Sequence, residues 1–380
     1  MPETTRVLTV LGDPNRIGAW SGTPYFFLKA GQEQGFLAAG LPLRPEDLRR
    51  RRLIWNLARL ARGARPGGFQ YTDRFLRPLF AQARLRDDQE IEIISHFPLL
   101  PPRPWPRGWR VSYYIDATLR QNFTDYGLAE RVNRKVREGA LRRELEHYHA
   151  AERVVCMSRW AAGSVVEHYG VPSSRVRVIL PGANLHEGDL APLPAHLEPA
   201  PLNPLRLGFI GKDWRRKGLP FLLQVAEELE RRRVGVRVVA LGPLAKDLPS
   251  HPLLERAGFV DKGRDSQRFV QLVRSFHFGC LFSSAEAYGI ANLECLRLGV
   301  PVLASRVGGI PDTVRDGLGY LFEPDCPPRL VADLLHSFVR DPAAYRALRQ
   351  CVSRSAGDFS WRRTVADFIA LWQGREHLAA

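Results

Sequence analysis

Short apolar runs alternate with amphipathic stretches along almost the whole chain. Six of the apolar runs have the length and the valine and isoleucine content of buried strands: residues 6–11, 90–95, 110–115, 153–156, 176–180 and 205–210. Strands that alternate with helices predict an α/β fold with parallel sheets. Because 380 residues exceed what one hydrophobic core usually supports, we expect two domains, each with helices on both faces of its sheet.

A proline-rich segment separates the two predicted domains. Residues 185–204 contain five prolines and interrupt the strand and helix pattern, which is typical of a linker. We therefore expect an N-terminal domain at residues 1–184 and a second domain at residues 205–357. The remaining residues, 358–380, are amphipathic and are expected to form a terminal helix.

Cysteine usage and hydropathy indicate the compartment. The five cysteines are odd in number and lack the spacing of metal ligands, which favours free thiols in a reducing environment. The first residues show no signal-peptide pattern, and no apolar run approaches the roughly 18 residues that a membrane-spanning helix needs. These observations predict a cytoplasmic protein.

The chain is strongly basic, with a formal charge of +15 at pH 7. Arginines concentrate at residues 44–65, and Leu53, Ile54 and Trp55 between them can form the apolar side of a helix. This pattern is typical of an amphipathic helix on an anionic surface, and it predicts peripheral contact with the inner face of the cytoplasmic membrane. A solvated face of an ordinary helix is an equally good interpretation.

Two glutamates, Glu286 and Glu294, lie eight positions apart near the end of a predicted strand at residues 279–282. A helix is expected to start near Asn292. Ligands of parallel sheets bind where strands end and helices begin, so both carboxylates should face that crevice. Two acidic acceptors at this place suit a ligand rich in hydroxyls, whereas an isolated pair would more often be two solvated residues of a helix face.

The residues around Glu286 and Glu294 resemble a sequence motif of a known protein family. With Gly289, Gly299, Pro301 and the run at residues 307–311, the segment resembles the donor-binding signature of the retaining family 4 glycosyltransferases, which have the GT-B fold. The resemblance implies two doubly wound Rossmann-like domains that face each other across a cleft. It also implies that the helix at residues 358–380 crosses back to the N-terminal domain, on the acceptor side.

The same resemblance assigns donor-binding roles. It implies that Glu286 contacts the transferred sugar and that Glu294 contacts the ribose of the nucleotide. Four neighbours are expected to complete this part of the donor site: Tyr288, Gly289, Ile290 and Ala291.

Residues 209–218 read as a strand, a tight loop and a helix start with four basic side chains. A diphosphate needs cationic donors and backbone amides at a helix N-terminus. By resemblance, Arg216 and Lys217 hold the donor phosphates, and Lys212 is a weaker third candidate. Taken alone, the cluster would more often be a solvated loop.

The first domain offers weaker candidates. Ser21 and Gly22 fall where the family has a glycine-rich loop near the phosphates. Asp116 falls where many relatives carry a histidine, and it either hydrogen-bonds the sugar or acceptor or caps the next turn. His96 follows another strand end, where a packed or capping histidine is the simpler interpretation.

The resemblance implies a retaining, metal-independent glycosyltransferase of the hexosyltransferase type. It would move a sugar from a nucleoside-diphosphate sugar, its co-substrate, to a lipid-linked or saccharide acceptor in cell-envelope glycolipid or polysaccharide synthesis. No other cofactor is expected. Catalysis would rest on Arg216 and Lys217, which would stabilise the leaving diphosphate, together with Glu286 and Asp116.

Two other functions are alternatives to glycosyl transfer. A GT-B nucleotide-sugar epimerase would carry a different set of acidic and histidine residues in its first domain. A basic nucleic-acid-binding protein would interleave its basic residues with exposed aromatic ones or carry a recognisable binding module. The arginine run at residues 44–65 lacks that pattern, so no nucleic-acid partner is expected.

Overall fold

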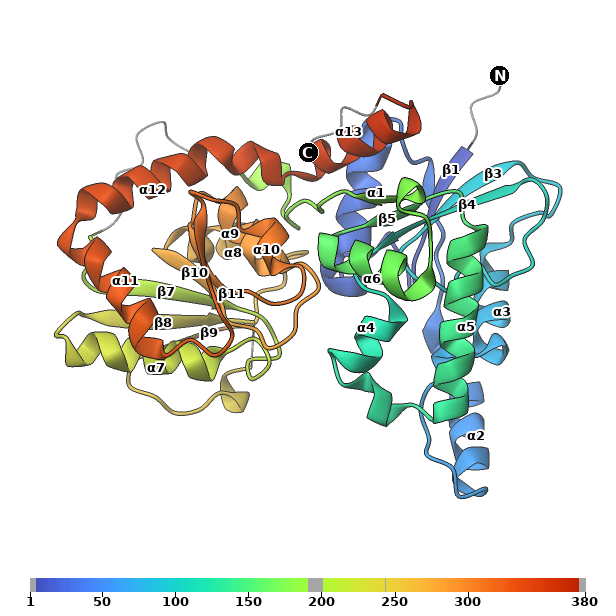
Figure 1. Ribbon diagram of the computed structural model, residues 1–380, viewed down its shortest axis with the longest axis horizontal. Coiled ribbons are helices and arrows are strands. Elements are labelled where there is room, and N and C mark those ends of the chain that lie inside the picture. The colour runs from blue at the N-terminus through green and yellow to red at the C-terminus, as the bar shows by residue number, and fades with distance from the viewer. Residues whose placement is uncertain (1–4, 191–200, 243, 376–380) are drawn as a thin grey trace. The chain divides into compact units, whose positions relative to one another are not determined.

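The computed structural model describes residues 5–190, 201–242 and 244–375 (Figure 1). The chain divides into two compact units. One comprises Met1–Leu180 with Thr364–Ala380, and the other comprises Pro181–Arg363. Half of the expected linker at residues 185–204 lies outside the described residues, since residues 191–200 are not described.

A parallel sheet with the strand order β2-β1-β3-β4-β5-β6 forms the centre of the first unit (Figure 1). Its strands are β1 Thr5–Thr9, β2 Ala39–Gly40, β3 Ile91–Ser95, β4 Trp109–Ile115, β5 Val154–Cys156 and β6 Val176–Val178. Its helices are α1 Thr23–Glu33, α2 Arg49–Leu60, α3 Asp73–Phe80, α4 Leu119–Thr124, α5 Arg134–Ala150, α6 Arg159–Tyr169 and α13 Trp361–Trp372. Every residue of β3 is buried, as expected for a parallel strand covered on both faces.

Two consecutive tyrosines of β4 show how helices cover the two faces of this sheet. Tyr114 packs against Phe368 of α13, with ring centroids 4.8 Å apart. Tyr113 packs against Tyr148 of α5 at 5.6 Å. Because neighbouring residues of a strand point to opposite faces, α13 and α5 cover opposite sides. The terminal helix is therefore part of the first unit's core.

A second parallel sheet, with the order β12-β11-β10-β7-β8-β9, forms the centre of the second unit. Its strands are β7 Leu205–Ile210, β8 Val236–Leu241, β9 Leu254–Gly258, β10 Phe278–Leu281, β11 Val302–Ser305 and β12 Gly319–Phe322. Its helices are α7 Leu219–Arg231, α8 Ser266–Arg274, α9 Ile290–Arg297, α10 Ile310–Thr313, α11 Pro328–Arg340 and α12 Pro342–Ser355. The prediction of two doubly wound domains is confirmed.

The strand order reverses between β7 and β10. From β7 the chain proceeds outward through β8 and β9, and from β10 it proceeds the other way through β11 and β12. The loops that follow the adjacent carboxyl ends of β7 and β10 therefore lie at a topological switch point, where open α/β sheets bind their ligands.

Most predicted elements agree with the observed ones to within about two residues, which is the usual uncertainty of element ends. The helix expected near Asn292 begins at Ile290, because Gly289 adopts a left-handed conformation, with φ 75°, and precedes the first turn. In the described ranges, no helix is long and apolar enough to cross a bilayer.

Candidate functional site

The loops that follow β7 and β10 meet through an ion-pair cluster. The Lys217 ammonium lies 3.2 Å from Oε2 of Glu286, and a guanidinium nitrogen of Arg216 lies 3.4 Å from the same oxygen. The Ser283 hydroxyl donates to that oxygen as well, at 3.3 Å. The Glu286 side chain is only 11% exposed, so this carboxylate is held inside the site.

Arg216 also links the two loops through hydrogen bonds of its backbone carbonyl and its guanidinium. Its carbonyl accepts a hydrogen bond from the Ser284 amide at 2.9 Å, and its guanidinium donates to the Ala285 carbonyl. The guanidinium also donates to Asp213 at 3.3 Å. The charges of Arg216 and Lys217 are thus balanced by two carboxylates, those of Asp213 and Glu286.

Two glycines allow these loops to approach closely. Gly218 has φ 81°, and a Cβ there would lie 2.1 Å from the Phe282 carbonyl oxygen. Gly308, in the loop after β11, has φ 54°, and a Cβ there would lie 1.8 Å from the Glu286 carbonyl oxygen. Any other residue at either position would clash with backbone. Gly218 therefore allows the close approach to Phe282, and Gly308 allows the close approach to the Glu286 backbone.

Glu294 lies on α9 and is 2% exposed, so it is not a solvated residue of a helix face. It forms an ion pair with Lys262, whose ammonium also lies 4.9 Å from the Phe269 ring centroid. The start of α9 is formed by Gly289, Ile290 and Ala291. Its unpaired amides give this end of the helix a partial positive charge.

The Lys212 side chain contacts Phe259 and not the two glutamates of the site. Its ammonium lies 4.8 Å from the ring centroid of Phe259, a side chain that is 52% exposed. Among the described residues, no ion pair joins Lys212 to Glu286 or Glu294. Of the three predicted phosphate ligands, the structure brings Arg216 and Lys217 together but not Lys212.

In the first unit, Ser21 and Gly22 lead into α1. Ser21 has a left-handed backbone with φ 58°, and Gly22, with φ 94°, is the N-cap of the helix. The sheet order makes β1 and β3 neighbours at this unit's own switch point. The loop after β1 therefore leads to a helix N-terminus at the edge where a ligand would bind.

Asp116 directly follows β4 and is half-buried. It is not the N-cap of α4, because that position is occupied by Thr118, whose hydroxyl accepts from the Gln121 amide at 3.2 Å. The N-cap of α4 is therefore Thr118, and a role of Asp116 in the turn before it or toward a ligand stays a prediction.

His96 is a packed residue. It is 2% exposed, and its ring lies against Phe27 and Tyr114. Its Nδ1 donates to the Tyr114 carbonyl at 2.8 Å, and burial lowers the pKa of the imidazole to about 4. The ring is therefore neutral at physiological pH, and within the described ranges its Nε2 has no hydrogen-bond partner.

Sequence reasoning missed Glu144 on α5. This buried carboxylate accepts from the Leu119 amide and from the Tyr148 hydroxyl, both at 2.8 Å, and from the Tyr169 hydroxyl. Burial raises its pKa to about 7. Because Leu119 begins α4, Glu144 anchors the segment that follows Asp116. No sequence signal marked it, since it lies among the charged residues of a helix that looks solvated throughout.

The cysteines are unpaired thiols, and three of them are buried: Cys156, Cys280 and Cys295. Burial raises the pKa of each of these three, so they remain protonated at neutral pH. Across the ranges that the structure describes, no three His, Cys, Asp or Glu side chains come together as a metal-binding group.

Part of the second unit matches a known protein family. Residues 204–341 match the family model described as glycosyl transferases group 1. The chain is 31% identical over 244 residues to D-inositol 3-phosphate glycosyltransferase of Nocardia farcinica, covering 59% of this chain and 54% of the relative. The same enzyme of Segniliparus rotundus is 27% identical over 257 residues, covering 64% and 56%. The chain thus spans just over half the length of these relatives.

Solved structures share the fold. Sucrose-phosphate synthase from Thermosynechococcus elongatus superposes with a TM-score of 0.69 at 16% identity, covering 97% of this chain and 98% of that one. Anabaena HepE in complex with UDP superposes with a TM-score of 0.61 at 14% identity, covering 97% and 100%. These matches confirm the predicted GT-B fold.

Proposed function

We propose that this protein is a retaining glycosyltransferase that moves a sugar from a nucleoside-diphosphate sugar to a hydroxyl acceptor. The observation that carries the proposal is the cluster of Arg216, Lys217 and Glu286 at the carboxyl ends of β7 and β10. A switch point of this kind is where a parallel sheet binds a nucleotide. The match of residues 204–341 to the glycosyl transferases group 1 model supports the same conclusion.

The leaving diphosphate is the group that this cluster suits best. As the glycosidic bond breaks, negative charge develops on the phosphate oxygens, and Arg216, Lys217 and the amides that begin α9 would stabilise it. Loss of one such donor typically lowers the rate by about 10²–10³. Stabilisation of the leaving diphosphate by these cations and amides would require no side-chain nucleophile and no metal ion.

Glu286 has to change partners during this reaction. Its Oε2 contacts both Lys217 and Arg216, at 3.2 and 3.4 Å. A diphosphate carries more negative charge than one carboxylate and would replace it on Arg216 and Lys217. The released carboxylate would then accept hydrogen bonds from hydroxyls of the transferred sugar. Glu286 would thereby couple donor binding to sugar recognition.

The ribose and the donor sugar would lie along the start of α9. Glu294 would accept from the ribose hydroxyls, as its buried carboxylate has acceptor capacity beyond the pair with Lys262. Tyr288 and the segment Gly289, Ile290 and Ala291 would line the sugar and phosphate positions. In the first unit, Ser21, Gly22 and Asp116 are proposed to serve the phosphates and the acceptor.

We propose a lipid-linked or saccharide acceptor in cell-envelope glycolipid or polysaccharide synthesis. The relatives are named for an acceptor that carries both hydroxyls and a phosphate, D-inositol 3-phosphate. The structural neighbour HepE has been solved with UDP and with UDP-glucose. The free thiols suit a reducing compartment, which supports a cytoplasmic location.

The test is transfer from a panel of nucleoside-diphosphate sugars to saccharide and glycolipid acceptors, with EDTA present and the product followed by NMR. We expect a product with the anomeric configuration of the donor. An inverted product would contradict the mechanism, and activity that disappears with EDTA would contradict metal independence. Conversion of the donor sugar without an acceptor would indicate an epimerase instead.

A further inference from the structure

Helix α2 presents its apolar side to solvent. Leu53, Ile54, Leu57 and Leu60, which we call the aliphatic stripe, are 60%, 67%, 56% and 55% exposed. A surface helix of a globular protein normally turns such residues toward the core. Positions 53, 57 and 60 share one face of the helix, so the exposure is continuous rather than scattered. This face requires a partner.

The helix is anchored on its other side. Trp55 packs against Phe69 with ring centroids 5.6 Å apart, and the Arg59 guanidinium lies 4.9 Å from the Trp55 ring centroid. The Asn56 side chain accepts from the Gly67 amide at 3.1 Å. These contacts fix the rotation of α2 about its own axis. The aliphatic stripe is therefore held outward by the fold.

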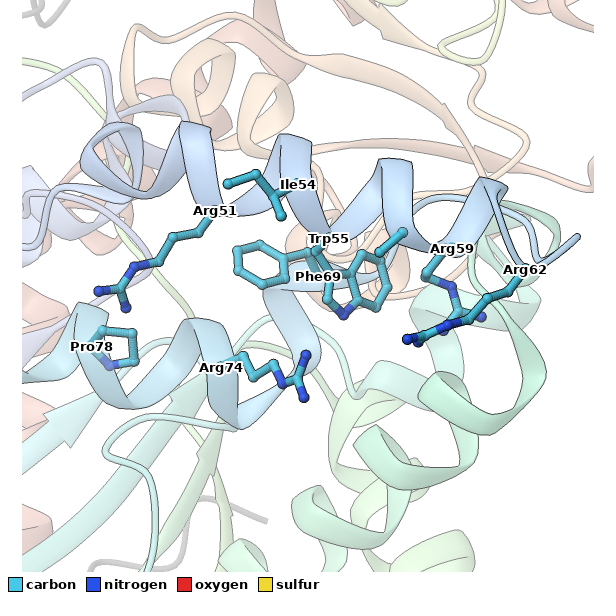
Figure 2. Close-up of a pocket in the computed structure, with 9 residues that line it drawn as sticks. Arg51, Ile54, Trp55, Arg59, Arg62, Phe69, Arg74 and Pro78 are labelled. Atoms are coloured by element: carbon cyan, nitrogen blue, oxygen red, sulfur yellow. The ribbon is translucent and has the colours of Figure 1, made fainter.

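A basic groove of about 480 Å³ runs along one flank of α2, between this helix and α3. Figure 2 shows four arginines around the aromatic pair of Trp55 and Phe69. The arginines that line this basic groove are Arg51, Arg59, Arg62 and Arg74. Carboxylates are absent from its lining residues. A ligand with anionic oxygens and an apolar portion matches this combination.

The positive charge of this region is not balanced by ion pairs. Within the described part of the chain, no ion pair is found for Arg51, Arg62 or Arg74, nor for the other arginines at residues 49–52. The nearest acidic residue in sequence to Arg74 is Asp73, and it pairs with Arg143 at 3.1 Å. The arginines are therefore available to an external anion.

From these observations we infer that α2 docks on an anionic lipid bilayer. The aliphatic stripe enters the boundary between headgroups and acyl chains, while the flanking arginines contact lipid phosphates. The basic groove takes the phosphate of one lipid, with Arg51, Arg62 and Arg74 around it. This inference stands on the first unit alone and does not depend on glycosyl transfer.

Charge and polarity select the bilayer over other partners. A second copy of the chain would bring one set of arginines against another, which is unfavourable. A nucleic acid would match the arginines, but it would leave the aliphatic stripe exposed to water. An anionic bilayer satisfies both features at once.

A second groove, of about 310 Å³, is lined on one side by Arg49 and Arg52 of α2, and on the other by Leu11, which closely follows the carboxyl end of β1. A lipid headgroup held in this second groove would lie next to the ligand-binding edge of the first sheet. If the proposed function is correct, this arrangement would present an acceptor hydroxyl from the membrane surface.

The experiment is flotation with phosphatidylcholine vesicles that either contain or lack phosphatidylglycerol. One variant replaces three stripe residues by glutamine, Leu53→Gln, Leu57→Gln and Leu60→Gln. A second neutralises three groove residues, Arg51→Gln, Arg62→Gln and Arg74→Gln. The control removes the same charge from exposed sites on α11 and α12, Arg340→Gln, Arg346→Gln and Arg354→Gln.

We expect the wild type and the control to float only with phosphatidylglycerol vesicles. The groove variant should bind roughly a hundredfold more weakly, since each arginine near an anionic surface contributes about a fivefold change. The stripe variant should also lose binding. Thermal unfolding would verify that each variant is folded.

Several results would overturn the inference. Equal losses in the groove variant and the control would mean that only net charge matters. Equal flotation with and without phosphatidylglycerol would exclude charge recognition. Binding of an oligonucleotide that the groove variant loses and the stripe variant keeps would identify a polyanion site. Self-association without vesicles that the stripe variant abolishes would identify a second copy as the partner.

Discussion

Lys217 and Glu286 form an ion pair, with 3.2 Å between Nζ and Oε2, that joins the loops after two neighbouring strands of the second sheet. The pair neutralises a cation at the place where a nucleoside diphosphate would bind. Arg216 contacts the same carboxylate oxygen. If the proposed function is correct, a donor diphosphate would replace this carboxylate on Arg216 and Lys217.

The Glu286→Gln substitution should lower the rate of sugar transfer without lowering the affinity for nucleoside diphosphate. The neutral amide competes less well for Lys217 and Arg216, so the affinity for nucleoside diphosphate should stay equal or increase. Transfer should fall by about 10²-fold or more, because the sugar loses a charged acceptor. Calorimetry with the diphosphate and a transfer assay would measure the two effects. A parallel loss of both would show that Glu286 is only a structural residue.

Lys262→Met should destabilise the second unit, because it leaves the Glu294 carboxylate buried without its ion partner. We expect a loss of about 3 kcal/mol in the free energy of unfolding. Adding Glu294→Gln should recover most of that stability but not the binding of the nucleotide ribose. If the double variant bound donor as the wild type does, Glu294 would not be a ribose ligand.

Gly308→Ala should distort the site that holds Glu286. The new Cβ would lie 1.8 Å from the Glu286 carbonyl oxygen, and the position also has φ 54°. We expect about 1–3 kcal/mol of destabilisation and reduced transfer. Gly357→Ala is the matched control, because a Cβ there would have no atom within 4 Å. Similar behaviour of the two variants would contradict the close approach.

We expect the free energy of unfolding to decrease as pH rises, because the buried Glu144 loses its proton. Burial raises the pKa of this carboxyl to about 7 from the ordinary 4.5, so the folded state binds its proton more tightly than the unfolded state does. Its contribution is therefore most favourable below pH 4.5 and is lost as pH rises through 7. The loss amounts to about 3 kcal/mol.

The Glu144→Gln variant tests this dependence, because its side chain cannot ionise. Thermal unfolding followed over this pH range should show a smaller decline in stability than in the wild type. Glu146→Gln, an exposed position on the same helix, is the control and should decline like the wild type. If all three proteins gave the same pH profile, Glu144 would not be the titrating group.

The parts of the site that could be predicted from sequence are those that lie within one strand, loop and helix segment. Glu286, Glu294, Arg216 and Lys217 were recognised because each follows a strand end at a motif spacing. Lys262 was missed, since it lies on a separate loop and meets Glu294 only through tertiary contact. Lys212 is predicted as a weaker third phosphate ligand from its place in the motif, and its contact with Phe259 likewise depends on tertiary structure.

The arginine-rich helix shows a related limit of sequence patterns. The sequence predicted an amphipathic helix, but the direction of its apolar side depends on what anchors it. Trp55 was assigned to that apolar side, yet it packs inward on Phe69 while Leu53 and Leu57 point to solvent. Periodicity indicates that a helix has two faces, and only packing determines which face is covered.

Calorimetric titration with uridine, guanosine and adenosine diphosphates, with EDTA present, tests whether Arg216, Lys217 and Glu286 form a donor site. We expect the wild type and the exposed-site control Arg346→Ala to bind one of these nucleotides, and Lys217→Ala to bind it at least tenfold more weakly. Failure of the wild type to bind any of them, or equal affinities in Lys217→Ala and the wild type, would contradict a donor site at this cluster.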